Sequence, residues 1–273
     1  MSKESLPYIV GQGDAVLKLF GQRTVDNSAA YLKDSLEPHM TILDVGCGPG
    51  SITIDLARRV PQGRVTGVDT ESARPTLDKA RAQAEREGVK NVDFRVGDAL
   101  ALPFADASFD VVHAHQVLIH VTDPLRMLAE MRRVAKPGGL VACRTWDDGT
   151  LMMVPPSEGV GRARAITQRV MDFSGRNFEA GRYTPRWARE VGFKPANIKV
   201  TTSNYTSYTP AERYYFASMM TNVLKESPMK TVALEKGLAT EEDFERGIAA
   251  WEEWTTNEDG LSVGVNVEIL CRV

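Results

Sequence analysis

The sequence has little cysteine, no long apolar run and no excess of positive charge. Three cysteines among 273 residues are an odd number, which argues against a disulfide framework. The first residues, Met-Ser-Lys-Glu-Ser, lack the apolar core of a secretory signal, and no stretch approaches the roughly 20 apolar residues of a transmembrane helix. We therefore expect a cytoplasmic protein with no membrane span.

The charge balance restricts the possible partners. A net charge of −3 supplies no basic surface for the phosphate contacts that dominate nucleic-acid binding, so we expect no nucleic-acid partner. A hydrophobic share of 42% and a charged share of 25% are typical of a globular protein with a large core. We expect this protein to be a monomer or a homodimer.

The most informative segment is residues 41–50, which read Thr-Ile-Leu-Asp-Val-Gly-Cys-Gly-Pro-Gly. Its apolar part predicts a buried parallel strand, and Gly46, Gly48 and Gly50 predict a tight turn into a helix at 51–60. Such a turn lets a ligand approach bare backbone. The spacing is not the Gly-x-Gly-x-x-Gly of dinucleotide sites, and no Gly-Lys-Ser/Thr of a phosphate-binding loop follows. The remaining candidate ligand is a nucleoside without a pyrophosphate. The alternative is an ordinary strand-to-helix turn that binds no ligand.

Three successive predicted strands end at an acid, namely Asp44, Asp69 and Asp98. The carboxyl ends of parallel strands meet at the edge where doubly wound sheets bind ligands. Asp69 is suited to accept hydrogen bonds from two ribose hydroxyls, and Asp98 from an exocyclic amine such as that of adenine. Singly, each acid is more often a helix cap or a solvated loop residue. Together the three acids favour a nucleoside pocket.

These motifs carry a resemblance to a known family. They comprise Leu43–Gly50, Val68–Asp69, Gly97–Ala99, Leu102–Phe104, Phe109–Val112 and Val134–Gly139. In combination they resemble the class I S-adenosylmethionine (SAM)-dependent methyltransferases, and within them the ubiquinone/menaquinone methyltransferase-like (UbiE-like) group, which includes many small-molecule methyltransferases of secondary metabolism. The resemblance covers about residues 40–146.

The resemblance implies a fold and an organisation. The alternation of strand and helix already predicts a parallel, doubly wound α/β sheet, and the family adds seven strands, the last antiparallel, with helical cap insertions. We expect an N-terminal helical lid at 1–37 and a SAM-binding core at 38–146. Residues 147–273 would complete the same domain, with cap insertions at about 147–182 and 209–260.

The resemblance also implies the cofactor and its contacts. SAM would be the methyl donor and S-adenosylhomocysteine (SAH) the product. The glycine turn would lie against the methionine part, Asp69 would hold the ribose, and Asp98 the adenine amine. The implied cofactor residues are Asp44, Gly46, Cys47, Gly48, Gly50, Asp69, Thr70, Asp98, Ala99, Leu100, His115 and Gln116, with Arg23 as a possible partner of the SAM carboxylate.

Methyl transfer does not require an obvious base. Proximity and orientation supply roughly 7 to 11 kcal/mol, whereas a general base adds about 3 to 5 kcal/mol. If there is a base, His115 is the first candidate and His120 the second, because neutral imidazole suits neutral pH. The alternative is that His115 contributes only its backbone carbonyl and the packing of its side chain. No metal site is expected, because no cysteine or carboxylate set completes a tetrahedron around these histidines.

The sequence gives less information about the methyl acceptor than about the cofactor. Candidate substrate residues are Tyr8, Trp146, Met153, Tyr183 and Met219, although core packing is the commoner role of such side chains. We expect a methyltransferase that acts on an oxygen, nitrogen, sulfur or carbon of a small, largely apolar metabolite. The alternatives are a protein or nucleic-acid methyltransferase, and a SAM-binding module without turnover.

Overall fold

A computed structural model describes residue 17 and residues 20–273 of the chain. The strands are β1 (Thr41–Val45), β2 (Arg64–Asp69), β3 (Val92–Val96), β4 (Phe109–His115), β5 (Ala135–Val154), β6 (Ile198–Ser207) and β7 (Leu261–Arg272). The helices are α2 (Val25–Ser28), α3 (Ala30–Lys33), α4 (Ser51–Arg59), α5 (Arg74–Arg86), α6 (Pro124–Val134), α7 (Glu158–Phe173), α8 (Thr184–Glu190), α9 (Pro210–Glu226), α10 (Pro228–Glu235) and α11 (Glu241–Thr256). Short 3-10 turns lie at Glu71–Ala73, Ala180–Tyr183 and Pro195–Asn197.

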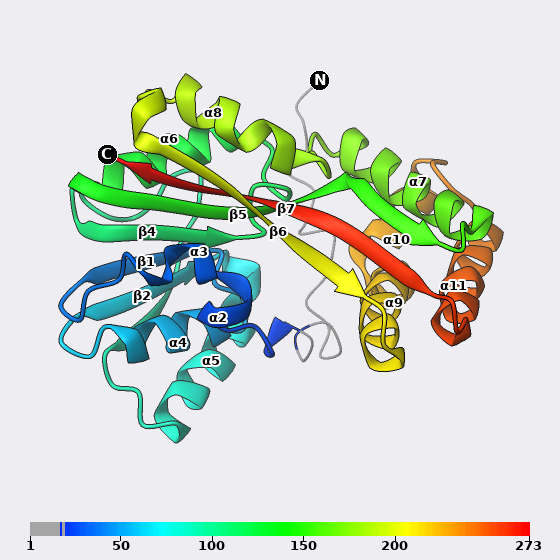
Figure 1. Cartoon of the computed structure of the whole chain (residues 1–273), viewed down its shortest axis with the longest axis horizontal. Helices are drawn as coiled ribbons and strands as arrows, with labels where there is room; N and C mark the ends of the chain where they lie inside the picture. The colour runs from blue at the N-terminus through cyan, green and yellow to red at the C-terminus, as the bar shows by residue number, and fades with distance from the viewer. Residues whose placement is uncertain (1–16, 18–19) are drawn as a thin grey trace. The chain divides into compact units, whose positions relative to one another are not determined.

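The seven strands form one sheet in the order β3-β2-β1-β4-β5-β7-β6. Strands β3, β2, β1, β4 and β5 pair in parallel. Strand β7 runs antiparallel to β5 (Figure 1), and the backbone of its neighbour Val273 exchanges hydrogen bonds with Gly138 and Gly139. The predicted doubly wound α/β sheet with an antiparallel last strand is confirmed.

The chain divides into two compact units. The sheet unit comprises Phe20–Asp147, Glu179–Ser203 and Asn266–Val273, and the described part of the helical unit comprises Asp148–Phe178 and Asn204–Val265. Strand β5 is longer than the sequence pattern indicates, since it continues beyond Trp146 to Val154 and passes from one unit into the other. Asp147, Asp148 and Gly149 interrupt the apolar pattern of the strand, and the apolar residues 151–154 that follow alternate between half-buried and exposed positions.

Apolar side chains cover both faces of the parallel strands in the sheet unit. On one face, Leu43 and Val112 pack with α6 and α8 through residues such as Leu128. On the other face, Ile42 and Val111 pack with α2, α3 and α4; Figure 1 shows these two groups of helices on opposite sides of the strands. Because side chains alternate along a strand, odd and even positions of each strand reach different layers.

The helical unit has a hydrophobic core of its own. Helices α7, α9, α10 and α11 contribute to it, and Trp251 is buried there against the rings of Phe216 and Trp254. This unit contains most of the segments predicted to be cap insertions, whose role as a cap stays a prediction. Of the predicted lid, α2 and α3 belong to the sheet unit. None of the described helices is long and apolar enough to cross a membrane.

Candidate functional site

The turn between β1 and α4 is held in a left-handed conformation. Gly46, Gly48 and Gly50 have φ values of +69°, +51° and +79°, which residues with a Cβ adopt only at a cost. The backbone amides of Gly46 and Cys47 both donate to the carbonyl oxygen of Val68, at 2.8 and 3.1 Å. The turn is thereby attached to the end of β2.

The three glycines differ in what surrounds them. A Cβ on Gly46 would lie 2.4 Å from Val117 Cγ2, and a Cβ on Gly50 would lie 2.7 Å from the Phe94 ring. A Cβ on Gly48 would meet no atom of the described residues within 4 Å. Gly46 and Gly50 are therefore needed for packing, whereas Gly48 borders open space that a ligand can enter.

Asp69 lies beside this open position, at the end of β2. Its Oδ2 accepts a hydrogen bond from the Gly48 amide at 2.8 Å, and its Oδ1 accepts one from the Thr70 amide at 2.7 Å. Partial burial raises the pKa of Asp69 despite these two hydrogen bonds. Oδ1 also accepts a longer hydrogen bond from the Thr70 hydroxyl at 3.4 Å, whereas Oδ2 keeps a further lone pair. The carboxylate is fixed in place and can still accept hydrogen bonds from a neighbouring diol.

The third acid lies at the end of the next strand. The Gly97 amide donates to the Asp69 carbonyl at 2.8 Å, which ties the chain after β3 to the end of β2. Asp98 is exposed, and its Oδ1 accepts from the Leu100 amide at 2.8 Å. Ala99 and Leu100 are partly buried against the core. Asp69 and Asp98 thus share the carboxyl edge of the sheet, as the sequence predicts.

Asp44 has a different environment although it belongs to the same pattern. Only 2% of it is exposed, and its Oδ1 is 2.8 Å from His113 Nδ1 while its Oδ2 accepts from the Thr53 hydroxyl at 2.6 Å. His113 Nε2 is buried without a hydrogen-bond partner in the described structure. The carboxylate therefore joins β1, β4 and α4. Its predicted contact with the SAM amino group stays a prediction.

His115 ends β4 on the same face as His113. Its Nδ1 is buried and has no hydrogen-bond partner in the part of the chain that the structure describes. Burial, followed by the positive charges of Arg23 and Arg144, lowers the pKa of His115 well below its ordinary value. The ring is accordingly neutral at neutral pH. His120 lies partly buried in the next turn, where its amide donates to the Val117 carbonyl at 2.8 Å.

Gln116 adopts a left-handed conformation, with φ +59°, directly after β4. Its side-chain Nε2 donates to Asn266 Oδ1 at 2.6 Å, and its Oε1 accepts from the Trp146 amide at 2.7 Å. The side-chain amide therefore bonds to residues of β5 and β7. Asn266 was not predicted, because no local sequence pattern marks it.

Comparisons with known proteins show the family of this chain. A family model described as a methyltransferase domain matches residues 36–172. A Schizosaccharomyces pombe protein named as an uncharacterized methyltransferase is 31% identical over 269 residues, which is 95% of each chain. The demethylmenaquinone methyltransferase of Lactococcus lactis is 36% identical over 152 residues, or 55% of this chain and 58% of that one.

The chain belongs to the class I SAM-dependent methyltransferases and to their UbiE-like group. Among solved structures, an N-methyltransferase of Haemonchus contortus has a TM-score of 0.58 at 18% identity, over 93% of this chain and 56% of that one. At such low identity the likeness shows the fold alone. SAM is the cofactor of this methyltransferase.

The substrate candidates of the methyltransferase fall in different parts of the chain. Trp146 and Tyr183 belong to the sheet unit, where Tyr183 stacks on Trp187 with ring centroids 5.8 Å apart. Met153 and Met219 lie partly buried at the core of the helical unit. The structure does not bring these two pairs together within one unit. Tyr8 lies outside the described residues.

Arg23 has an aromatic neighbour within the described structure. Its guanidinium carbon lies 4.0 Å from the centroid of the Phe20 ring, a cation–π contact. Arg23 is also near enough to His115 for its charge to lower the pKa of that ring. Its predicted contact with the SAM carboxylate stays a prediction.

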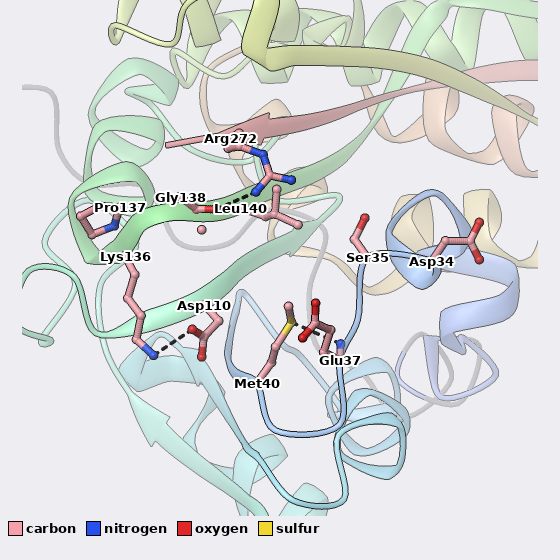
Figure 2. A pocket seen from close by; sticks show the side chains of 11 residues that line it. Asp34, Ser35, Glu37, Met40, Asp110, Lys136, Pro137, Gly138, Leu140 and Arg272 are labelled. Carbon is pink, nitrogen blue, oxygen red and sulfur yellow. Dashed lines mark hydrogen bonds and ion pairs between the residues drawn. The ribbon is translucent and has the colours of Figure 1, made fainter.

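A cavity of about 450 Å³ lies at the opposite, amino edge of the sheet (Figure 2). Its lining residues include Asp110 and Lys136, whose Oδ1 and Nζ are 2.9 Å apart. Arg272 Nη1 donates to the Gly138 carbonyl at 2.8 Å. These three charged groups are already paired within the protein, and the cavity is remote from the carboxyl edge where Asp69 lies. We therefore place the cofactor elsewhere.

The surroundings of the glycines predict unequal effects of adding one methyl group. Gly48→Ala should lower the free energy of unfolding by about 1 to 2 kcal/mol, the cost of a left-handed residue with a Cβ. Gly46→Ala should lower the free energy of unfolding by about 1 to 3 kcal/mol more than Gly48→Ala does, because its Cβ would overlap Val117. Urea unfolding of both variants without ligand measures the difference. Equal losses would contradict the packing role assigned to Gly46.

The amino-edge cavity predicts a pH dependence of stability. Partial burial opposes ionisation of Asp110, but hydrogen bonds from Thr41 and Lys136 outweigh it and lower the pKa to about 2. This carboxylate therefore stabilises the fold above the pKa of an unfolded aspartate, and its contribution is lost as pH falls toward 2. The stability difference between wild type and Asp110→Asn should narrow from pH 6 to pH 3, measured by urea unfolding. A constant difference would refute this assignment.

Proposed function

We propose that this methyltransferase binds SAM along the carboxyl edge of the sheet, with Asp69 as the main cofactor-binding side chain. The observation that supports this most strongly is the placement of the Asp69 carboxylate. Two backbone amides fix it beside Gly48, the position in the turn with open space. A carboxylate held in this way can accept hydrogen bonds from both hydroxyls of a ribose once the Thr70 hydroxyl, 3.4 Å from Oδ1, turns away.

The neighbouring residues suit the rest of the nucleoside. Asp98 is exposed at the end of the next strand, so its free oxygen can accept from an adenine amine. Ala99 and Leu100 offer apolar surface next to it. On the other side of Asp69, the bare backbone of Gly48 leaves room for the methionine part. In the proposed site the ligand thus passes over the ends of β1, β2 and β3.

SAM, when bound, would supply an electrophilic methyl group: the acceptor would bond to the methyl carbon as the carbon–sulfur bond broke and SAH left. The chain's contribution is to hold the reactants in a row and to exclude water, which is worth roughly 7 to 11 kcal/mol. His115 is neutral and can accept a proton, but its lowered pKa makes it a weak base. We therefore assign most of the rate acceleration to orientation, and we keep His115 as the candidate base if the acceptor must lose a proton.

We further propose that the acceptor is a small, largely apolar metabolite. One named relative supports a small molecule, since demethylmenaquinone gives its name to the Lactococcus lactis enzyme. In this chain, Met153 and Met219 lie in an apolar cluster of the helical unit, and methionine adapts readily to apolar ligands. The cytoplasmic location, the role in secondary metabolism and the oligomeric state stay predictions.

The cofactor site is tested by ligand-induced stabilisation. SAM and SAH should raise the melting temperature of the wild type, since a ligand at 100 times its Kd adds about 2.7 kcal/mol. NAD and NADP should not. Asp69→Ala loses charge-assisted hydrogen bonds worth about 1.5 to 3 kcal/mol, so titration calorimetry should show SAH affinity falling roughly 10- to 100-fold.

Asp93→Ala is the matched control for this measurement. Asp93 also accepts a backbone hydrogen bond, from the Phe94 amide at 2.9 Å, but it lies within β3 rather than at its end. The control should bind SAH like the wild type. If Asp69→Ala bound SAH with unchanged affinity, the assigned role of Asp69 would be wrong.

The acceptor class is tested with methyl-labelled SAM and a cell extract. After incubation, the mixture is separated on an ultrafilter that retains proteins and nucleic acids. Label in an organic extract of the filtrate is expected for a small apolar acceptor. Label confined to the retained fraction would favour a macromolecular acceptor, and no enzyme-dependent label in either fraction would favour a SAM-binding module without turnover.

A further inference from the structure

Gln116 occupies a backbone conformation that its residue type does not favour. Only Gln116 and Ala107 combine a side chain with a positive φ among the residues that the structure describes, and the φ of Gln116 is +59°. For any residue with a Cβ, this conformation is higher in free energy than the right-handed one. Such a residue persists where its surroundings hold it, and such positions cluster at functional sites.

Three hydrogen bonds hold Gln116 in this state. Its backbone amide donates to the Arg144 carbonyl at 2.8 Å. Its side chain is bonded at both ends, through Nε2 to Asn266 Oδ1 at 2.6 Å and through Oε1 to the Trp146 amide at 2.7 Å. Asn266 is only 2% exposed, so its side-chain oxygen has little water to compete with the bond to Gln116. Strands β5 and β7 together clamp the residue that follows β4.

The conformation of Gln116 bears directly on the glycine turn. The next residue is Val117, and its Cγ2 occupies the space that a Cβ on Gly46 would need, only 2.4 Å from that position. A rotation at Gln116 would displace Val117 and with it the packing against Gly46. The turn that carries Gly48 and orients its amide toward Asp69 begins at Gly46. A continuous series of contacts therefore connects Asn266 on β7, through Gln116 and Val117, with the proposed cofactor site.

We propose that Asn266 is a positioning residue of the cofactor site: it holds Gln116 in the left-handed conformation that sets Val117 against the glycine turn. Asn266 itself need not touch the cofactor. This inference rests on the proposed function, because it takes SAM and SAH to bind at that turn. It predicts that affinity for SAH depends on the backbone state at position 116.

Two substitutions at one position separate this role from plain packing. Gln116→Ala and Gln116→Gly both remove the side-chain amide and differ by a single methyl group. Glycine adopts a positive φ without penalty, whereas alanine does not. By titration calorimetry, Gln116→Ala should weaken SAH binding about tenfold, and Gln116→Gly should recover most of that loss. If the amide served only as a structural tie, the two variants would bind SAH equally.

Asn266→Ala completes a double-mutant cycle. Alone it should weaken SAH binding about tenfold, whereas in the Gln116→Gly background it should change the affinity less than about twofold, because no strained residue remains to be held. Thr201→Val is the control. It removes a 2.8 Å hydrogen bond from β6 to Glu268, two residues beyond Asn266 on β7, and should leave SAH affinity unchanged.

The outcomes are distinguishable from a failure of the proposed function. If the wild type binds neither SAM nor SAH, the cofactor assignment falls and this inference falls with it. If the wild type binds SAH and the alanine and glycine variants at position 116 are equal in affinity, only the positioning role of Asn266 is overturned. The comparison at position 116 stands whether or not Asn266→Ala folds, and melting temperatures measured without ligand report folding of every variant.

Discussion

The hydrogen bonds that the Val68 carbonyl accepts from Gly46 and Cys47 attach the turn after β1 to the end of β2. Once the turn is attached there, the Gly48 amide reaches the Asp69 carboxylate, and Asp69 is held at the edge of the sheet. This arrangement requires positive φ angles in the turn and, at Gly46, the absence of a Cβ. The proposed cofactor site thus depends on a short backbone connection between adjacent strands.

Buried polar groups join strands β5, β7 and β6 at the antiparallel end of the sheet. Arg144 on β5 is 8% exposed; its Nη1 donates to the Asn27 carbonyl, and its Nε lies 3.6 Å from Glu268 on β7. Glu268 in turn accepts hydrogen bonds from Thr201 and Ser203 on β6. Loss of one partner from such a set leaves another polar group buried and unpaired, which is costly. The set therefore restricts which strand registers the sheet can adopt.

The positions proposed to bind the cofactor could be placed at the sheet edge from the sequence because their signals are local. A strand pattern, a glycine at a left-handed position and an acid at a strand end each lie within a few residues, and parallel pairing brings successive strand ends to one edge. The placement of Asp69 and Asp98 followed from that reasoning. The far half of β5 could not be predicted in this way, because Asp147, Asp148 and Gly149 interrupt the apolar pattern before it resumes at residues 151–154. The grouping of the helices into a unit with its own core also depends on contacts between distant segments.

The sequence by itself determined the α/β class, the glycine turn and the edge at which SAM is expected, because each follows from short patterns of hydrophobicity and backbone freedom. Only the tertiary structure decided that Asp44 and Asp69, which look alike in sequence, have different surroundings. Asp44 is paired with His113 from 69 residues away, and Gln116 is held by Asn266 from 150 residues away. Such pairs depend on strand order and register across the whole sheet. A left-handed glutamine leaves no local trace, since its conformation is imposed by partners that folding brings to it.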